Sequence, residues 1–224
     1  MGLERFLLLI PPFIFAITIH EYAHGWVAER RGDPTARYMG RLTFNPIAHI
    51  DPFGTVLLPL ALILISIGTR GAPFFFGYAK PVPVDVYNLR NPKQDMVWIS
   101  VSGPLSNMCG ALGAGIVFRL LLAVTGVPEG PLAAIHTMFA YAVYINLLLA
   151  AFNLLPVPPL DGFHILCGLL PDEAAGVCRG LERHGFFILI AVLFLGRFLV
   201  WGIIGVFIAI FGTLFAGPWL GQFL

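Results

Sequence analysis

Charged side chains are scarce in this sequence. Only 11% of its 224 residues are Asp, Glu, Lys or Arg, and the formal net charge is +1. A typical soluble domain carries about 25% charged residues. No run of basic residues is present, so nothing in the sequence indicates nucleic-acid binding. With 58% hydrophobic residues and a mean hydropathy of +0.86, the chain is predicted to be an integral membrane protein that works in a lipid bilayer.

Cysteine and long polar segments are scarce as well. The three cysteines, Cys109, Cys167 and Cys178, form no CxxC pair, and an odd number gives no disulfide framework. They are therefore expected to be small apolar packing residues. No non-apolar segment exceeds about 30 residues, which is well below the size of a domain. Residues 1–224 are thus predicted to form one membrane domain.

Apolar segments recur along the whole chain. Five are predicted, at residues 3–28, 52–68, 96–124, 132–156 and 186–217. About 20 apolar residues cross the hydrocarbon core of a bilayer. The last segment is too long for one span and should divide at Gly196-Arg197. The expected fold is an all-α, multi-pass bundle of about five or six transmembrane helices.

The first apolar segment contains the sequence His20-Glu21-Tyr22-Ala23-His24. Residues four apart share one face of a helix, so His20 and His24 can bind one metal ion together. Glu21 would then lie beside the metal, where it can take a proton from a bound water. Such a pattern arises by chance in soluble helices. Three ionisable groups inside a membrane segment are costly, however, and indicate a function.

Two histidines and a water leave a tetrahedral zinc site one protein ligand short. Asp161 is a candidate, because Pro156, Pro158 and Pro159 hold the preceding backbone extended and Gly162 permits a turn. Local sequence allows a solvated turn aspartate at this position equally well. The other nearby candidates turn away from the histidines or sit in a polar loop: Glu29, Asp33, His49 and Asp51.

Three motifs together resemble the site-2 protease family of intramembrane zinc metalloproteases, peptidase family M50. They are HEYAH in the first segment, Gly103-Pro-Leu-Ser-Asn107, and Asn153-x-x-Pro156-x-x-x-x-Asp161-Gly162. The stretches 40–55 and 76–83 resemble the compact prokaryotic branch of this family. The resemblance covers roughly residues 5–165. Many members also carry PDZ or CBS domains, for which this chain has no room.

The resemblance implies roles for individual residues. In the family, both HExxH histidines and the aspartate of the last motif bind zinc, and the HExxH glutamate is the base. The corresponding residues here are His20, His24, Asp161 and Glu21. The asparagine of the last motif, Asn153, is expected to help hold the substrate or the oxyanion. Asn107 matches a position near the active site, and His164 could support the site or be an ordinary polar residue at a helix start.

The sequence therefore predicts an intramembrane zinc metalloprotease of a prokaryotic plasma membrane, with one zinc ion per chain. Its substrates would be membrane-spanning or membrane-tethered proteins. The alternative is a zinc-binding transporter or scaffold that uses the same ligands. A transporter has no need of Glu21, whereas hydrolysis needs a base, so Glu21 favours the enzyme.

Two further expectations concern the arrangement of the segments. HEYAH lies near the C-terminal end of its segment, and Asp161 follows the C-terminal end of another. Segments 3–28 and 132–156 should therefore run parallel, which would make the short segment 52–68, broken at Pro59, a re-entrant or partial crossing.

The polar connections between the apolar segments bear on two further points, a small strand and the orientation in the membrane. The alternating residues 82–86 could form a small edge strand near the membrane surface. Loops 29–51 and 69–95 hold four Lys or Arg residues each. The positive-inside rule therefore gives no orientation from the sequence alone.

Overall fold

The structure is a computed structural model that describes residues 3–57, 61, 80–127 and 130–224. Four helices in these ranges are long and apolar enough to cross a membrane, judged by length and composition. They are α1 (Leu3–Arg31), α4 (Pro92–Thr125), α5 (Pro131–Asn153) and α9 (Arg197–Ala216). No strand is present in the described residues. The predicted all-α membrane architecture is confirmed.

Shorter elements connect and flank these four helices. After α1 come α2 (Thr35–Tyr38), the 3-10 turn η1 (Pro46–His49), the π-helical turn η2 (Pro52–Leu57) and the 3-10 turn η3 (Val86–Asn88). After α5 come α6 (Asp161–Leu169), η4 (Asp172–Ala174), α7 (Ala175–Arg183) and α8 (Gly185–Leu195), and η5 (Leu220–Gln222) follows α9. The predicted division of the last apolar segment is correct, because α8 ends and α9 begins on either side of Gly196.

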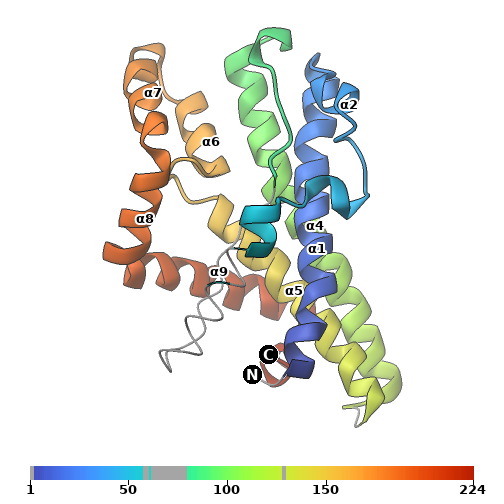
Figure 1. Cartoon of the computed structure of the whole chain (residues 1–224). Coiled ribbons are helices and arrows are strands. Elements are labelled where there is room, and N and C mark those ends of the chain that lie inside the picture. The colour runs from blue at the N-terminus through green and yellow to red at the C-terminus, as the bar shows by residue number, and fades with distance from the viewer. Residues whose placement is uncertain (1–2, 58–60, 62–79, 128–129) are drawn as a thin grey trace.

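Helices α1, α4 and α5 form the centre of the bundle. In Figure 1, α1 and α5 run in the same direction and α4 runs against them, as the positions of the metal-site motifs require. Small buried residues let these helices approach closely: Ala16 of α1 packs with Tyr141 and Ile145 of α5. A second cluster joins Phe118 of α4 to Leu147 of α5, and it includes residues of α9.

The end of α1 and the start of α4 lie side by side. The backbone N–H of Arg90 donates to the carbonyl of Arg31 over 3.2 Å, and the Arg31 guanidinium lies 3.3 Å from the Asp95 carboxylate. The chain therefore makes no net crossing of the bundle between these two points. Most of the segment 52–68 lies outside the described residues, so its re-entrant course stays a prediction.

The edge strand expected at residues 82–86 does not form. Residues 80–85 pair with no strand in the part of the chain that the structure describes, and a 3-10 turn begins at Val86. Two backbone N–H groups of this segment donate to carboxylates instead: Val82 to Glu21 over 2.8 Å and Asp85 to Asp33 over 2.7 Å. Side-chain acceptors therefore satisfy donors that a sheet would otherwise pair. We call residues 80–89 the strap.

The expectation for the cysteines is wrong for two of the three. Cys167 of α6 and Cys178 of α7 form a disulfide, with their Cα atoms 6.1 Å apart, while Cys109 is free and exposed. The turn around η4 folds α7 back toward α6 and brings the two sulfurs together. This pairing depends on tertiary structure, and the 11-residue separation matches no pattern that sequence reasoning recognises.

Candidate metal centre

Three side chains from two helices converge inside the bundle. His20 and His24 lie one turn apart on α1, and Asp161 is the first residue of α6. Their ligand atoms all lie within 4.8 Å of one another. The Nε2 atoms of His20 and His24 lie 3.2 and 3.4 Å from Oδ2 of Asp161. Asp161 thus faces the histidines and is not a solvated turn residue.

The remote nitrogen of each imidazole is engaged by an acceptor. Nδ1 of His24 lies 2.7 Å from the carbonyl oxygen of Ile99, and Nδ1 of His20 lies 2.7 Å from Oδ1 of Asn107. A carbonyl oxygen only accepts, so both Nδ1 atoms carry the proton. In the neutral imidazoles both Nε2 atoms are then left with a lone pair, which is the form that binds a metal ion.

A relay of buried amides fixes the orientation of Asn107. Its Nδ2 donates to the carbonyl of Ala16 over 2.9 Å and to Oδ1 of Asn146 over 3.0 Å, so its own Oδ1 must face His20. Asn146 is oriented in turn, because its Nδ2 donates to the carbonyl of Ala142. Both amides are fully buried. The sequence left the role of Asn107 undefined, and the structure shows that its side chain orients the candidate ligand His20.

Asn146 itself was not singled out in the sequence. It lies within the apolar segment 132–156, where a polar side chain has to find a partner in the protein interior. That isolated amide was the signal that could have found it.

The donor set fits a zinc ion. Oδ2 of Asp161 is buried and has no hydrogen-bond partner, although two imidazole nitrogens lie close to it. The two Nε2 atoms are 3.0 Å apart, and neither carries a proton in the tautomers assigned above. Three converging lone pairs in a buried site are unfavourable unless a cation lies among them. Two imidazoles and one carboxylate, with a fourth position open, are a ligand set typical of catalytic zinc.

Gly103 of α4 lies directly against the two imidazoles. A Cβ atom at this position would overlap Nε2 of His24 and Cε1 of His20. Where α4 approaches the site, glycine is therefore the one residue type that leaves room for both rings, because it has no Cβ atom. Gly113, on the same helix, has open space where its Cβ would be.

The strap passes over Glu21, the residue after the first histidine. Glu21 is half-buried, and its Oε2 accepts the N–H of Val82, whose side chain is buried against Gly25. The strap is also held just before this contact, at Lys80. The Lys80 N–H donates to the carbonyl of His49, and the Arg41 guanidinium donates to the carbonyl of Lys80. The site glutamate is thus held by the backbone of a distant segment.

Asp33 anchors the other half of the strap. It is fully buried and accepts hydrogen bonds from the Asp85 backbone, the Asn88 amide and Thr35. Burial alone would raise the pKa of Asp33, but the hydrogen bonds from Thr35, Asn88 and the Asp85 backbone outweigh it and lower the pKa below its ordinary value. The anchor is therefore ionised at neutral pH. Its contribution is lost only in strong acid, as the pH falls through the lowered pKa.

Two other predicted residues stand apart from the three ligands. Asn153 is the last residue of α5, and its Nδ2 donates to the carbonyl of Leu149 in its own helix. His164 faces α7, where its Nδ1 lies 3.9 Å from the Glu182 carboxylate. His164 therefore belongs to the contact between α6 and α7, and no contact joins it to the histidines of α1.

Comparisons with known proteins show the family to which the chain belongs. The family model of peptidase family M50 matches residues 119–195. The chain is 38% identical over 199 residues to the Bacillus subtilis protein named "Putative zinc metalloprotease YwhC", which covers 86% of this chain and 84% of that protein. It is 28% identical over 191 residues to a Mycobacterium tuberculosis protein named "Putative zinc metalloprotease Rip2". That match covers 85% of this chain and 67% of the relative. No solved structure matches the chain.

We expect Gly103→Ala to weaken zinc binding at least tenfold, because the new methyl group must displace both imidazoles. Gly113→Ala is the matched control, since it adds the same methyl group to the same helix in open space. Competition with a chromogenic zinc chelator in detergent would measure both affinities. Equal affinity for the two variants would contradict the position assigned to Gly103.

Proposed function

Since this chain belongs to peptidase family M50, we propose that it is an intramembrane zinc metalloprotease that hydrolyses peptide bonds of membrane-spanning or membrane-tethered proteins. The observation that carries the proposal is the convergence of His20, His24 and Asp161 beside Glu21, within a bundle of apolar helices. The substrate is a polypeptide, because the relatives are named metalloproteases. We infer that the substrate lies in or beside the membrane, because the candidate metal centre lies among the membrane-spanning helices.

The proposed ligands of one zinc ion are His20, His24 and Asp161. When bound, zinc supplies a Lewis acid that lowers the pKa of a water molecule and polarises the scissile carbonyl. Glu21 would accept the proton from that water and pass it to the leaving amine. The Val82 N–H holds the Glu21 carboxylate in place for both transfers. Ile99 and Asn107 keep the imidazoles in the metal-binding tautomer.

We also propose that Asn153 helps to hold the substrate or the oxyanion. Its Nδ2 is engaged with its own helix. The side chain is half-buried at the end of α5, eight residues before Asp161. Nδ2 carries a second N–H, which a contact with the substrate or the oxyanion would use.

The site opens toward the end of the bundle where basic residues gather. His24 precedes Arg31 by seven residues, so it lies about 10 Å below that end of the helix. The described parts of the two polar loops, residues 29–51 and 80–95, are at this same end, because α1 ends where α4 begins. The connection between α4 and α5, residues 126–130, holds no Lys or Arg. By the positive-inside rule, the basic end faces the cytoplasm.

Replacing Glu21 tests the enzyme against a zinc-binding transporter or scaffold. Purified protein in detergent would be incubated with a generic single-span substrate, and cleavage sites would be read by mass spectrometry. Glu21→Gln should retain zinc and lose at least 100-fold in rate, as expected for removal of a general base. Glu29→Gln, at the C-terminal end of the same helix, should cleave the substrate at the wild-type rate. Cleavage by Glu21→Gln at the wild-type rate would refute the role of Glu21.

Replacing Val82 tests how Glu21 is held. Val82→Pro removes the one N–H that donates to the carboxylate, and we expect kcat to fall about tenfold with zinc content and KM unchanged. Val82→Ala keeps the N–H and should retain most of the activity. Val84→Pro controls for adding a proline to the strap. If Val82→Ala lost as much kcat as Val82→Pro, side-chain packing rather than the hydrogen bond would be responsible.

A further inference from the structure

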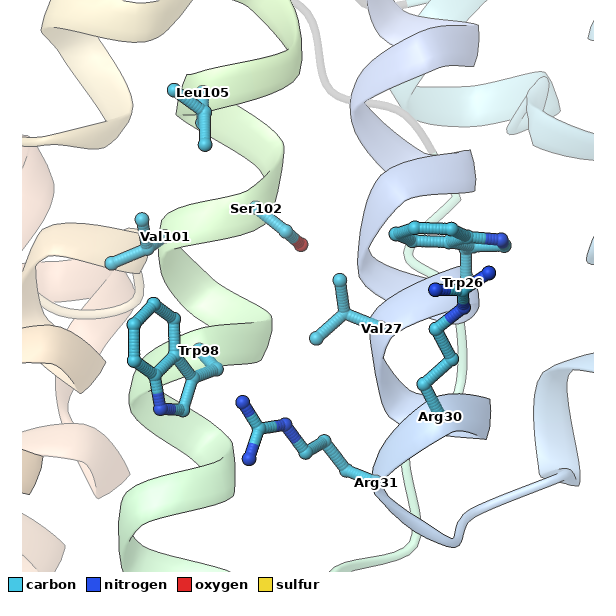
Figure 2. A pocket seen from close by; sticks show the side chains of 8 residues that line it. All are labelled: Trp26, Val27, Arg30, Arg31, Trp98, Val101, Ser102 and Leu105. Carbon is cyan, nitrogen blue, oxygen red and sulfur yellow. The ribbon is translucent and has the colours of Figure 1, made fainter.

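A pocket of about 290 Å³ lies between α1 and α4, on the outer side of the bundle and at its basic end. Figure 2 shows its side chains: Leu105 of α4 lies at one end and the arginines of α1 lie at the other, with Val27 and Val101 between them. We call the end that carries Arg30, Arg31 and the two tryptophans the mouth. The lining is used by none of the steps proposed for peptide hydrolysis. It is apolar inside and cationic at one end only.

The two arginines at the mouth differ in their partners. Arg31 forms an ion pair with the buried Asp95, 3.3 Å away, so its charge is largely balanced inside the protein. Arg30 makes no ion pair with any described carboxylate, and its guanidinium carbon lies 3.8 Å above the ring of Trp26. Stacking fixes the plane of this guanidinium and leaves its N–H groups free. The mouth therefore carries one oriented positive charge that forms no ion pair with a described carboxylate.

Two tryptophans place the mouth at the membrane boundary. Trp26 lies in the last turns of α1 and Trp98 in the first turns of α4, and they are 39% and 55% exposed. Indole rings at the ends of transmembrane helices gather at the level of the lipid headgroups. The pocket thus extends from the headgroup region into the hydrocarbon layer.

We propose that this pocket binds one anionic phospholipid, with its phosphate at Arg30 and Arg31 and the upper part of an acyl chain along the valines and Leu105. A basic pocket between transmembrane helices is suited to an anionic headgroup. The interior offers little to a free phosphate or another wholly polar ligand, because the Ser102 hydroxyl already donates to the carbonyl of Ile99 over 2.6 Å. The volume holds part of a lipid, and the remainder lies in the bilayer.

The pocket shares a wall with the candidate metal centre. Ser102 immediately precedes Gly103, which lies against both imidazoles, and Val27 is three residues after His24. A seated lipid would therefore pack on the turns of α1 and α4 that carry the site. The proposal does not depend on proteolysis, since it concerns binding alone.

The test is lipid binding to the full, delipidated chain in detergent, counted by native mass spectrometry. Phosphatidylglycerol and phosphatidylcholine of the same chain length would be titrated separately. The wild type should bind one phosphatidylglycerol in preference to phosphatidylcholine. Arg30→Gln should reduce that preference about fivefold, the effect expected for one basic residue at a membrane surface. Arg37→Gln removes the same charge at the same end but outside the pocket, where Arg37 pairs with Glu29, and should leave the preference unchanged.

Three results would overturn the proposal. Equal affinity for the two lipids would exclude recognition of an anionic headgroup. An equal loss in Arg30→Gln and Arg37→Gln would reduce the effect to general attraction between charges. Displacement of phosphatidylglycerol by an equal concentration of inorganic phosphate, or by a water-soluble acidic peptide, would assign the mouth to a free anion or to a protein segment. Gel filtration of each variant establishes that it remains folded.

Discussion

A buried carboxylate oxygen without a hydrogen-bond partner, Oδ2 of Asp161, imposes the strictest requirement on this molecule. It faces two imidazole nitrogens at 3.2 and 3.4 Å, so a proton or a metal cation has to lie among the three atoms. The surrounding residues meet this requirement. Ile99 and the amides of Asn107 and Asn146 fix the rings, and Gly103 leaves them room. The arrangement of α1, α4 and α5 follows from bringing these groups to one point.

The strap adds a second constraint, which acts on Glu21. Its backbone is held by groups from the polar connection after α1, chiefly Arg41, His49 and Asp33. Glu21 is therefore linked to residues more than 50 positions away in the chain, although it neighbours a candidate metal ligand. The strap and the buried Asp33 therefore act together. Carboxylates accept N–H groups of the strap that would otherwise pair in the sheet suggested by the sequence pattern.

Much of the site could be predicted because its signals are local. The spacing of His20 and His24 requires a shared helix face, and the proline-rich turn before Asp161 restricts where its carboxylate can point. The relation between these two motifs also predicted that α1 and α5 run parallel. The break at Gly196 was visible in the length of the last apolar segment.

What could not be predicted depends on contacts between distant segments. The disulfide of Cys167 and Cys178 requires the fold of α7 onto α6, which no spacing rule describes. Alternation at residues 82–86 indicated a strand, but the described residues contain no strand to pair with it, and carboxylates accept two of its N–H groups. The equal numbers of basic residues in two loops give no orientation from the sequence, because counting alone does not show that residues 29–51 and 80–95 lie at the same end.

X-ray absorption at the zinc edge of the purified protein is the most direct measurement of the proposed centre, combined with metal analysis of wild type and Asp161→Ala. The account predicts one zinc per wild-type chain, with two imidazole nitrogens at about 2.0–2.1 Å, further oxygen ligands and no sulfur. It also predicts that Asp161→Ala loses the oxygen contributed by the side chain and binds zinc more weakly. A spectrum with sulfur or more than two imidazoles, or a wild-type chain that binds no zinc, would contradict the assignment of His20, His24 and Asp161.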